Sequence, residues 1–408
     1  MKKLLWLGCL SYLTIGIAHI VGGALLEQLI EHYGITYKDG GQWIMNQFLG
    51  FLVGVLLAPS LTSRFGKRTT VLIAFGALTL GEAAYSLLLP WGFMLAIAPM
   101  AGFGFGMIEA VVGAMIIDSV KNGKASAMSR LETFFGVGAL AIPIAVAFLI
   151  QQHVWQLSFP ILAALSGITF VLWFTMSFGD MDEKLGPVPK EQRDEAHAAV
   201  KRTPLEAKGK LFGYELSAIP FLLFAALFFM VYVGMEMSFS NYLPSFLILR
   251  EGMPEAGAAA ALSLFWGMMV VGRLFAGAIA DRVGYVRYLG IAVVGASAVF
   301  VLFALMNGLS WMLACIVLSG LLFSGVFGIA LVYANEMLPG MTERTTSILV
   351  ACGGLGGALF PKATGWFLDN YSIGTTLWFI SVLVGVMLLL LVGMFVINKR
   401  RMNQASAQ

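Results

Sequence analysis

Apolar runs long enough to cross a lipid bilayer recur along nearly the whole chain, and they limit its fold more than any other feature. A transmembrane helix needs about 20 mostly apolar residues to cross roughly 30 Å of hydrocarbon. Such runs occur in two sets of six, near residues 4–30, 41–62, 69–89, 92–118, 127–150 and 157–178, and near 214–248, 257–280, 285–306, 310–338, 345–369 and 373–397. Only 12% of the 408 residues are charged, against about 25% in soluble domains. We therefore expect an all-α polytopic membrane protein with twelve transmembrane helices.

A polar stretch separates the two sets of runs. Residues 179–212 mix acidic and basic side chains with three prolines. This composition is typical of a solvated linker. The sequence thus predicts two six-helix bundles, residues 1–178 and 213–408, joined by a linker at 179–212.

Basic residues gather on one side of the predicted spans. That side receives Lys2 and Lys3, residues 64–68 and 121–130, the linker and the tail, whereas the opposite loops keep only Lys38 and Arg250. Cytoplasmic loops carry an excess of Lys and Arg in membrane proteins. We therefore expect both termini and the linker to be cytoplasmic.

One carboxylate lies deep within a glycine-rich run. On a helix, Glu109 shares one face with Gly102, Gly106 and Gly113, and small residues let other helices or a cavity approach such a face. An ionised carboxylate at the bilayer centre costs about 2.5–3.5 kcal/mol on insertion scales. Glu109 is therefore expected to face the interior, protonated, paired or hydrated, as the acid of a proton-coupled transporter does.

Two loops repeat one pattern, one in each set of runs. They are Pro59-Ser-Leu-Thr-Ser63-Arg64-Phe-Gly66-Lys67-Arg68 and Gly277-Ala-Ile-Ala-Asp281-Arg282-Val-Gly284. The second fits G-x-x-x-D-R/K-x-G in full, and the first has Pro59 and Ser63 in place of the leading Gly and the Asp. This pattern resembles the cytoplasmic loop signature of the major facilitator superfamily.

Each position of the loop pattern has a physical role. The leading Gly permits close helix packing, the Asp can cap a helix N-terminus in the opposite half, and the basic residues hold the loop at the anionic leaflet. The candidate gating residues are Arg64, Gly66, Arg68, Gly277, Asp281, Arg282 and Gly284.

Further motifs follow one another through most of the chain. They are Gly16-Ile-Ala-His19-Ile, Gln47-Phe-Leu-Gly50-Phe-Leu-Val-Gly54, Gly106-Met-Ile-Glu109-Ala-Val-Val-Gly113, Met128-Ser-Arg130-Leu-Glu132-Thr-Phe-Phe-Gly136-Val-Gly138 and Gly234-Met-Glu236-Met-Ser-Phe-Ser-Asn241-Tyr-Leu-Pro244. In these motifs the chain resembles the fucose/glucose:proton symporter family, and within it the glucose/mannose:proton symporters of Gram-positive bacteria. The resemblance implies two pseudo-symmetric six-helix bundles in a bacterial plasma membrane, and it implies that Glu109 takes and releases the coupling proton. Fucose-type members have an asparagine where this chain has Phe135, which argues against fucose as the substrate.

Other polar residues within the runs are candidates for the transport site. His19 and Glu236 join Glu109 as candidates for proton coupling, because an imidazole titrates near neutral pH. The alternatives are that His19 only donates a hydrogen bond and that Glu236 pairs with Arg273. Sugars need polar groups matched to their hydroxyls and an aromatic face. The candidates for substrate binding are therefore Asn46, Gln47, Glu132, Asn241 and Trp266.

These substrate-binding candidates also have structural alternatives. Amides and tryptophans often serve helix packing or the membrane interface. Glu132 can instead pair with Arg130 or Arg273.

The function that follows is secondary active transport: proton-coupled uptake of a neutral hexose, glucose-like or mannose-like, by alternating access. The alternative is a proton-coupled efflux antiporter for drugs or amphipathic compounds, which also needs a membrane-embedded acid. The antiporter signature G-x-x-x-G-P is not found in residues 136–143, which disfavours it. A third class is a non-transporting nutrient sensor. An enzyme is not expected, because no segment groups a nucleophile, a base and an orienting residue.

We expect the partners to be a small-molecule substrate, a proton and the lipid bilayer. No cofactor, metal or nucleic-acid partner is expected, and the predicted state is a monomer.

Overall fold

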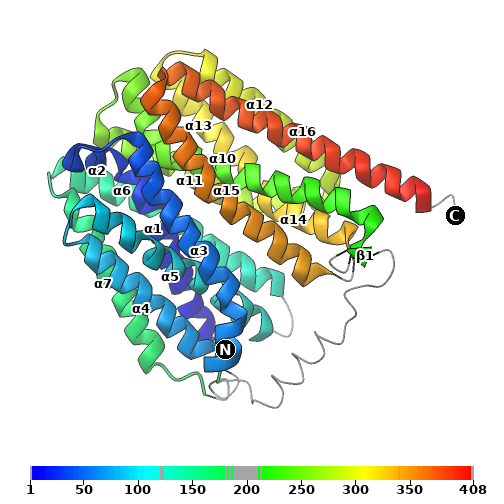
Figure 1. Ribbon diagram of the computed structural model, residues 1–408, viewed down its shortest axis with the longest axis horizontal. Helices are drawn as coiled ribbons and strands as arrows, with labels where there is room; N and C mark the ends of the chain where they lie inside the picture. Colours follow the sequence, from blue (N-terminus) through cyan, green and yellow to red (C-terminus); the bar gives the residue numbers. More distant parts are fainter. Residues whose placement is uncertain are drawn as a thin grey trace.

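The computed structural model describes residues 2–119, 124–179, 182, 185–186, 210–211, 214–339 and 341–405. Long helices make up almost all of this part of the chain (Figure 1). The helices of the first half are α1 (Lys2–Ala24), α2 (Leu26–Tyr33), α3 (Tyr37–Phe65), α4 (Lys67–Tyr85), α5 (Trp91–Ser119), α6 (Lys124–Gln151) and α7 (Ser158–Thr175). Those of the second half are α10 (Ile219–Glu251), α11 (Glu255–Val283), α12 (Tyr285–Leu305), α13 (Leu309–Phe323), α14 (Val326–Met337), α15 (Thr342–Asn370) and α16 (Ile373–Ala405).

Short elements complete the described fold. A two-stranded antiparallel hairpin, β1 (Lys210–Leu211) and β2 (Tyr214–Glu215), precedes α10, with Lys210 opposite Glu215. Single turns of 3₁₀-helix, η1 (Trp155–Leu157) and η2 (Leu216–Ala218), lead into α7 and α10. Most of the predicted linker, residues 179–212, lies outside the described residues.

Eleven helical segments of the described chain are long and apolar enough to cross a membrane. Two of the predicted spans are broken: α1 gives way to α2 at Leu25, and α13 gives way to α14 at Ser324 and Gly325. The predicted span at 69–89 corresponds to α4, which is not among the eleven because its 19 residues include Lys67, Arg68 and Glu82. The all-helical prediction is therefore confirmed, with the third span more polar than the others.

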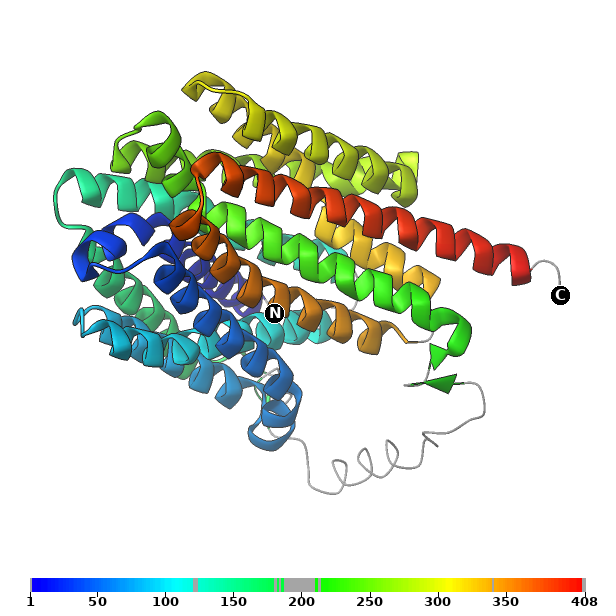
Figure 2. The ribbon, with the colours of Figure 1, turned by 45° about the horizontal axis from the view of Figure 1, so that its top comes forward.

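The helices pack in two groups that meet along two seams. In the first group α1 packs on α6, α3 and α4 pack on α5, and α4 packs on α7. In the second group α10 packs on α15 and α16, α11 packs on α13, and α12 packs on α13 and α16. The seams between the groups are α3 against α15 and α6 against α11. Figures 1 and 2 show α1–α7, in blue to green, beside α10–α16, in green to red.

Close backbone contact brings α5 against α3. Gly102 packs on the carbonyl oxygen of Gln47, and Gly106 packs on the backbone of Phe51, so a Cβ atom at either glycine would collide with α3. Backbones can approach this closely only where the residue is small. This contact fixes the rotation of α5 about its axis and places Glu109, less than one turn beyond Gly106, at the cavity between the two groups.

Polar contacts join the two groups at the end where α3 begins. The carboxylate of Asp369, on α15, accepts hydrogen bonds from the backbone N–H groups of Tyr37, at 2.9 Å, and Lys38, at 2.8 Å. The hydroxyl of Tyr242, on α10, donates to the carbonyl oxygen of Tyr37 at 2.9 Å. Gln28 donates to Glu255 across the same end at 2.6 Å. A carboxylate at a helix N-terminus is favoured by the helix dipole as well as by its hydrogen bonds.

We expect Asp369→Ala to favour opening of this end. The substitution removes two hydrogen bonds to a charged acceptor, a loss of about 1–2 kcal/mol at an exposed helix end, which changes the ratio of open to closed molecules roughly five- to thirtyfold. The readout is the rate at which an impermeant maleimide labels Ser245→Cys, a position fully buried at this end. The native cysteines Cys9, Cys315 and Cys352 are first replaced.

The control for this experiment is Asp118→Asn. Asp118 pairs with Lys67 at 2.6 Å within the first group, at the motif-loop end and not at the end held by Asp369, so its loss is expected to leave the labelling rate unchanged. Equal labelling rates in Asp369→Ala and the parent protein would show that Asp369 does not hold this end closed.

Candidate functional site

A cavity of about 610 Å³ lies between the two groups of helices. It runs from His19 and Trp266 to Asp281 and Tyr285, which lie where α11 ends and α12 begins. The cavity therefore reaches the end of the molecule that carries the two motif loops, opposite the end joined by Asp369. A volume of this order is typical of sites that bind small molecules.

Four of the charged side chains that line the cavity act on one another electrostatically: Glu109 from α5, Glu132 from α6, Glu236 from α10 and Arg273 from α11. The Arg273 Nη1 atom lies 3.8 Å from Glu132 Oε2, an ion pair that crosses the seam between α6 and α11. Arg273 also acts electrostatically on Glu109 and on Glu236.

One guanidinium thus interacts with three carboxylates. Like charges near one another in a weakly polar surrounding favour proton uptake, because protonation removes their repulsion. The cluster is therefore suited to binding and releasing protons. The enclosed Nη1 atom of Arg273 has no hydrogen-bond partner among the described residues, so Arg273 keeps a donor free.

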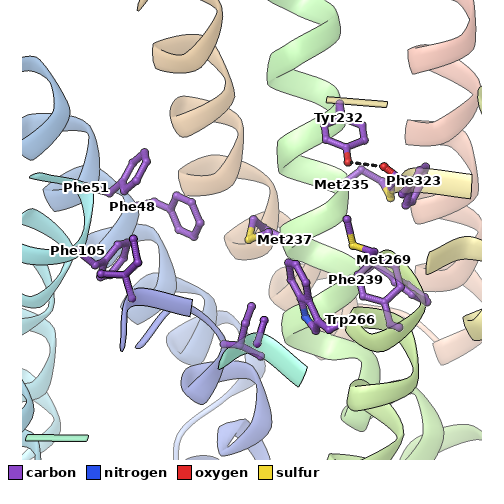
Figure 3. Close-up of a cluster of buried hydrophobic side chains, with 14 of the residues drawn as sticks. Phe48, Phe51, Phe105, Tyr232, Met235, Met237, Phe239, Trp266, Met269 and Phe323 are labelled. Atoms are coloured by element: carbon purple, nitrogen blue, oxygen red, sulfur yellow. Dashed lines mark hydrogen bonds between the residues drawn. The ribbon is translucent and has the colours of Figure 1, made fainter. Parts of the chain in front are cut away.

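The carboxylates differ in how they are held. Glu236 Oε1 lies 3.0 Å from the hydroxyl of Tyr232. The same hydroxyl lies 3.2 Å from the carbonyl oxygen of Phe323 (Figure 3). The side chain of Glu109 has no hydrogen bond to any described residue, while its backbone carbonyl accepts one from Tyr12 at 2.9 Å. Among the described residues, Glu109 is therefore the carboxylate of the cluster whose side chain has neither a hydrogen bond nor an ion pair.

Aromatic rings form much of the remaining wall. The ring of His19 is surrounded by Phe48, Phe51, Phe105 and Phe135, with centroids 5.0, 6.2, 4.9 and 5.8 Å away. Figure 3 shows Phe48, Phe51 and Phe105 on one side and Met237 and Trp266 on the other. Trp266 is held in place because its indole N–H donates to the hydroxyl of Ser240 at 2.9 Å.

The structure brings together five of the predicted proton-coupling and substrate-binding residues. His19, Glu109, Glu132, Glu236 and Trp266 all line the cavity. Their roles in coupling and binding stay predictions.

The three amides predicted to bind substrate do not line the cavity. Asn46 donates to the carbonyl oxygen of Leu95 at 3.0 Å and accepts from Gln42 at 2.7 Å. Asn241 donates to the carbonyl oxygen of Met237, one turn earlier in α10, at 2.8 Å. Gln47 is buried, and its backbone carbonyl packs on Gly102. In this conformation all three serve contacts within or between helices.

Sequence reasoning did not assign Arg273, Phe48 or Phe51 to the site, although all three line the cavity. Arg273 was identifiable as a partner for Glu132 or Glu236, since it lies within an apolar run. Phe48, Phe51 and Phe105 carry no such signal, because phenylalanine is common throughout the chain, with 31 copies.

The two motif loops have matching backbone geometry. Gly66 and Gly284 have φ angles of 86° and 88°, in the left-handed region where a side chain is strained. Each donates its N–H to the carbonyl four residues earlier, Thr62 or Ala280. The internal repeat seen in the sequence therefore extends to the turn conformation.

The basic and acidic residues of the loops make different contacts in the two halves. Arg68 donates to the carbonyl oxygens of Trp173, Phe174 and Met176 at the end of α7 and pairs with Asp182 at 3.2 Å. Arg64 is exposed and lies 5.3 Å from the ring of Phe65.

The second loop stays within its own half. Asp281 accepts a hydrogen bond from Tyr285 at 3.2 Å, rather than capping a helix of the first half. Arg282 is exposed, and Gly277 and Asp281 line the open end of the cavity. Among the described residues, no hydrogen bond or ion pair joins the two loops in this conformation.

The acid beside Arg68 lies outside the spans, and its environment favours its charged form. The Ser177 hydroxyl, the backbone N–H of Phe178 and the guanidinium of Arg68 hold the pKa of Asp182 below its usual range. The bridge from α4 to the segment after α7 therefore persists at neutral pH. Among the described residues, no group of three or more His, Cys, Asp or Glu side chains is placed to hold a metal ion.

Comparison with known proteins agrees with this architecture. The chain is 27% identical over 383 residues to the glucose/mannose transporter GlcP of Bacillus subtilis, covering 93% of this chain and 92% of that protein. It is 24% identical over 391 residues to the Bypass of stop codon protein 6 of Saccharomyces cerevisiae, covering 89% and 76%.

Solved structures show the same fold at low identity. A nucleoside transporter, NupG, superposes with a TM-score of 0.75 at 14% identity, covering 96% of this chain and all of that one. A D-xylose-proton symporter superposes with a TM-score of 0.75 at 12% identity, covering 96% and 97%. The family model of the Major Facilitator Superfamily matches residues 4–361. The chain, an all-helical transporter with a central cavity rather than an enzyme, therefore belongs to the Major Facilitator Superfamily.

Proposed function

We propose that this transporter takes up a neutral hexose together with protons, by alternating access. The observation that carries the proposal is the pairing, in one cavity, of a carboxylate-rich cluster around Arg273 with an aromatic wall that includes Phe135 and Trp266. The cluster is suited to proton exchange, and aromatic rings are suited to the apolar face of a sugar. The similarity to a glucose/mannose transporter supports the same substrate class.

In this proposal Glu109 is the coupling group. With Glu109 ionised, Arg273 is shared between it, Glu132 and Glu236, and the excess negative charge opposes closure of the cavity around the cluster. Protonation of Glu109 leaves Arg273 to the other two carboxylates. The cavity then closes at the motif-loop end at a lower electrostatic cost, and release of the proton restores the starting state.

The alternative is proton-coupled efflux of amphipathic compounds. One observation favours it: much of the cavity wall is apolar, including Met128, Met237 and Phe327. The experiment below separates the two functions, because efflux requires no affinity for hexoses.

We expect Glu109→Gln to abolish concentrative uptake of labelled glucose into proteoliposomes under an inward proton gradient in sodium-free buffer. Glutamine keeps the shape but cannot exchange a proton, so equilibrium exchange of glucose is expected to persist within about threefold of the parent rate. The matched control is Glu31→Gln, at an exposed position on α2, which is expected to keep both activities.

Two other results would count against this assignment. Concentrative uptake that survives in Glu109→Gln would place the coupling proton elsewhere. Absence of hexose uptake by the parent, together with gradient-driven extrusion of a lipophilic dye, would establish efflux instead.

We also expect Arg273→Gln to destabilise the protein more than Glu132→Gln does. Removing the guanidinium leaves three carboxylates without a cation, whereas removing Glu132 leaves Arg273 with two. The double variant Arg273→Gln/Glu132→Gln is expected to recover about 1–2 kcal/mol of coupling energy, since one repelling carboxylate is gone. The measurement is the midpoint of thermal unfolding in detergent for the four proteins of the cycle. Additive effects of the two substitutions would show that the pair is not coupled.

A further inference from the structure

We propose that His19 recognises the substrate rather than carrying the proton: it exchanges a hydrogen bond with one hydroxyl of the bound sugar from within a recess walled by phenylalanines. This inference rests on the proposed function, since it names a contact within the same site. It also moves His19 out of the set of proton-coupling candidates.

Four phenyl rings form apolar walls around the imidazole of His19. Phe48 and Phe51 come from α3, Phe105 from α5 and Phe135 from α6, and all four centroids lie within 6.2 Å of the imidazole centroid. No described carboxylate forms an ion pair with His19, although Glu109 and Glu132 line the same cavity. The imidazole is therefore set apart from the charged cluster.

The hydrogen-bonding state of the ring favours its neutral form. Nδ1 is enclosed and has no partner among the described residues. An imidazolium presents an N–H donor at both nitrogens, and one of them would then be buried against phenyl rings without an acceptor. A neutral ring avoids burying this charge.

The other nitrogen is the one that a ligand can reach. His19 lines the cavity and makes no hydrogen bond to a described residue, so Nε2 remains for a bound molecule. In the neutral ring Nε2 is a donor or an acceptor, depending on the tautomer. A sugar hydroxyl both donates and accepts, so it matches either tautomer, whereas a carboxylate or an ammonium group matches only one.

Phe135 links this recess to the second half of the cavity. Its ring centroid is 5.8 Å from that of His19 and 6.3 Å from that of Trp266. The polar edge of the imidazole and the two aromatic rings are thus presented together. A pyranose is complementary to this arrangement, because it has hydroxyls at its rim for the imidazole and C–H groups on its face for the aromatic rings.

The test uses the series of monodeoxyglucoses as competitors of labelled glucose in equilibrium exchange. In the parent protein, removal of the hydroxyl that meets His19 is expected to weaken competition at least tenfold. In His19→Ala this penalty is expected to fall below twofold, because the partner is absent, while the penalties at the other hydroxyls stay as they are. His19→Asn, which keeps a donor and an acceptor, is expected to retain part of the penalty.

The control is His153→Asn, at an exposed residue with φ 57°, a conformation that asparagine tolerates. It is expected to match the parent protein in every assay. Size-exclusion profiles and unfolding midpoints confirm that each variant is folded. If His19→Ala does not fold, His19→Asn decides: a penalty that is reduced at one hydroxyl relative to the parent protein supports the contact, and penalties that are all undiminished refute it.

Three results would overturn the inference. Deoxyglucose penalties that persist in full in the His19 variants would remove His19 from sugar recognition. Loss of concentrative uptake with normal exchange in His19→Asn would make it a proton carrier. A parent protein that exchanges no hexose would refute the proposed function and, with it, this contact, and that failure is visible before any variant is made.

Discussion

The position of a single guanidinium among three carboxylates constrains much of this structure. Charged groups inside a membrane protein are costly unless they are paired, hydrated or neutralised by protons. Arg273 pairs across a seam with Glu132 and acts also on Glu109 and Glu236, so no arrangement of one cation satisfies all three ionised acids. Because the cluster lines the cavity, water can hydrate the carboxylates that Arg273 does not neutralise. The glycine contacts of α5 with α3 determine the position of Glu109.

The two ends of the molecule differ in the way their helices are joined. At one end Asp369 and Tyr242 bind the first turn of α3 across the seam. At the other end Asp281 bonds, among the described residues, to Tyr285 of its own half, and Arg68 binds the end of α7. The ion pair between Glu132 and Arg273 crosses the seam between α6 and α11. Its length of 3.8 Å is that of a loose ion pair rather than of a tight hydrogen-bonded contact.

The sequence predicted the spans well because helix length in a membrane is set by the thickness of the hydrocarbon. The run at 285–306, for example, is the helix Tyr285–Leu305. The glycine pattern also placed Glu109 toward the interior, since only small residues permit the approach of α3. The two motif loops predicted the family, and each has a glycine, Gly66 or Gly284, at a positive φ that would strain a residue with a side chain.

Side-chain partners were not predictable in the same way. An amide within a span can be satisfied by a carbonyl one turn away, as Asn241 is by Met237, or by a neighbouring helix, as Asn46 is by Leu95. Composition does not distinguish these outcomes from contact with a ligand. The surroundings of His19 depend on rings from three other helices, and no local pattern links those helices in the sequence.

The break between α13 and α14 has a further consequence. The hydroxyl of Tyr232 has one proton, yet it lies within hydrogen-bonding distance of both Glu236 and the carbonyl of Phe323, the last residue of α13. When Glu236 is ionised it is the stronger acceptor and accepts the hydrogen bond from the hydroxyl of Tyr232. The carbonyl oxygen of Phe323 then lacks this donor. When Glu236 is neutral, the hydroxyl is released to that carbonyl. The hydrogen bonding of the Phe323 carbonyl, at the end of α13, therefore depends on the protonation state of Glu236, on α10. The hydroxyl proton of Tyr232 connects the two groups.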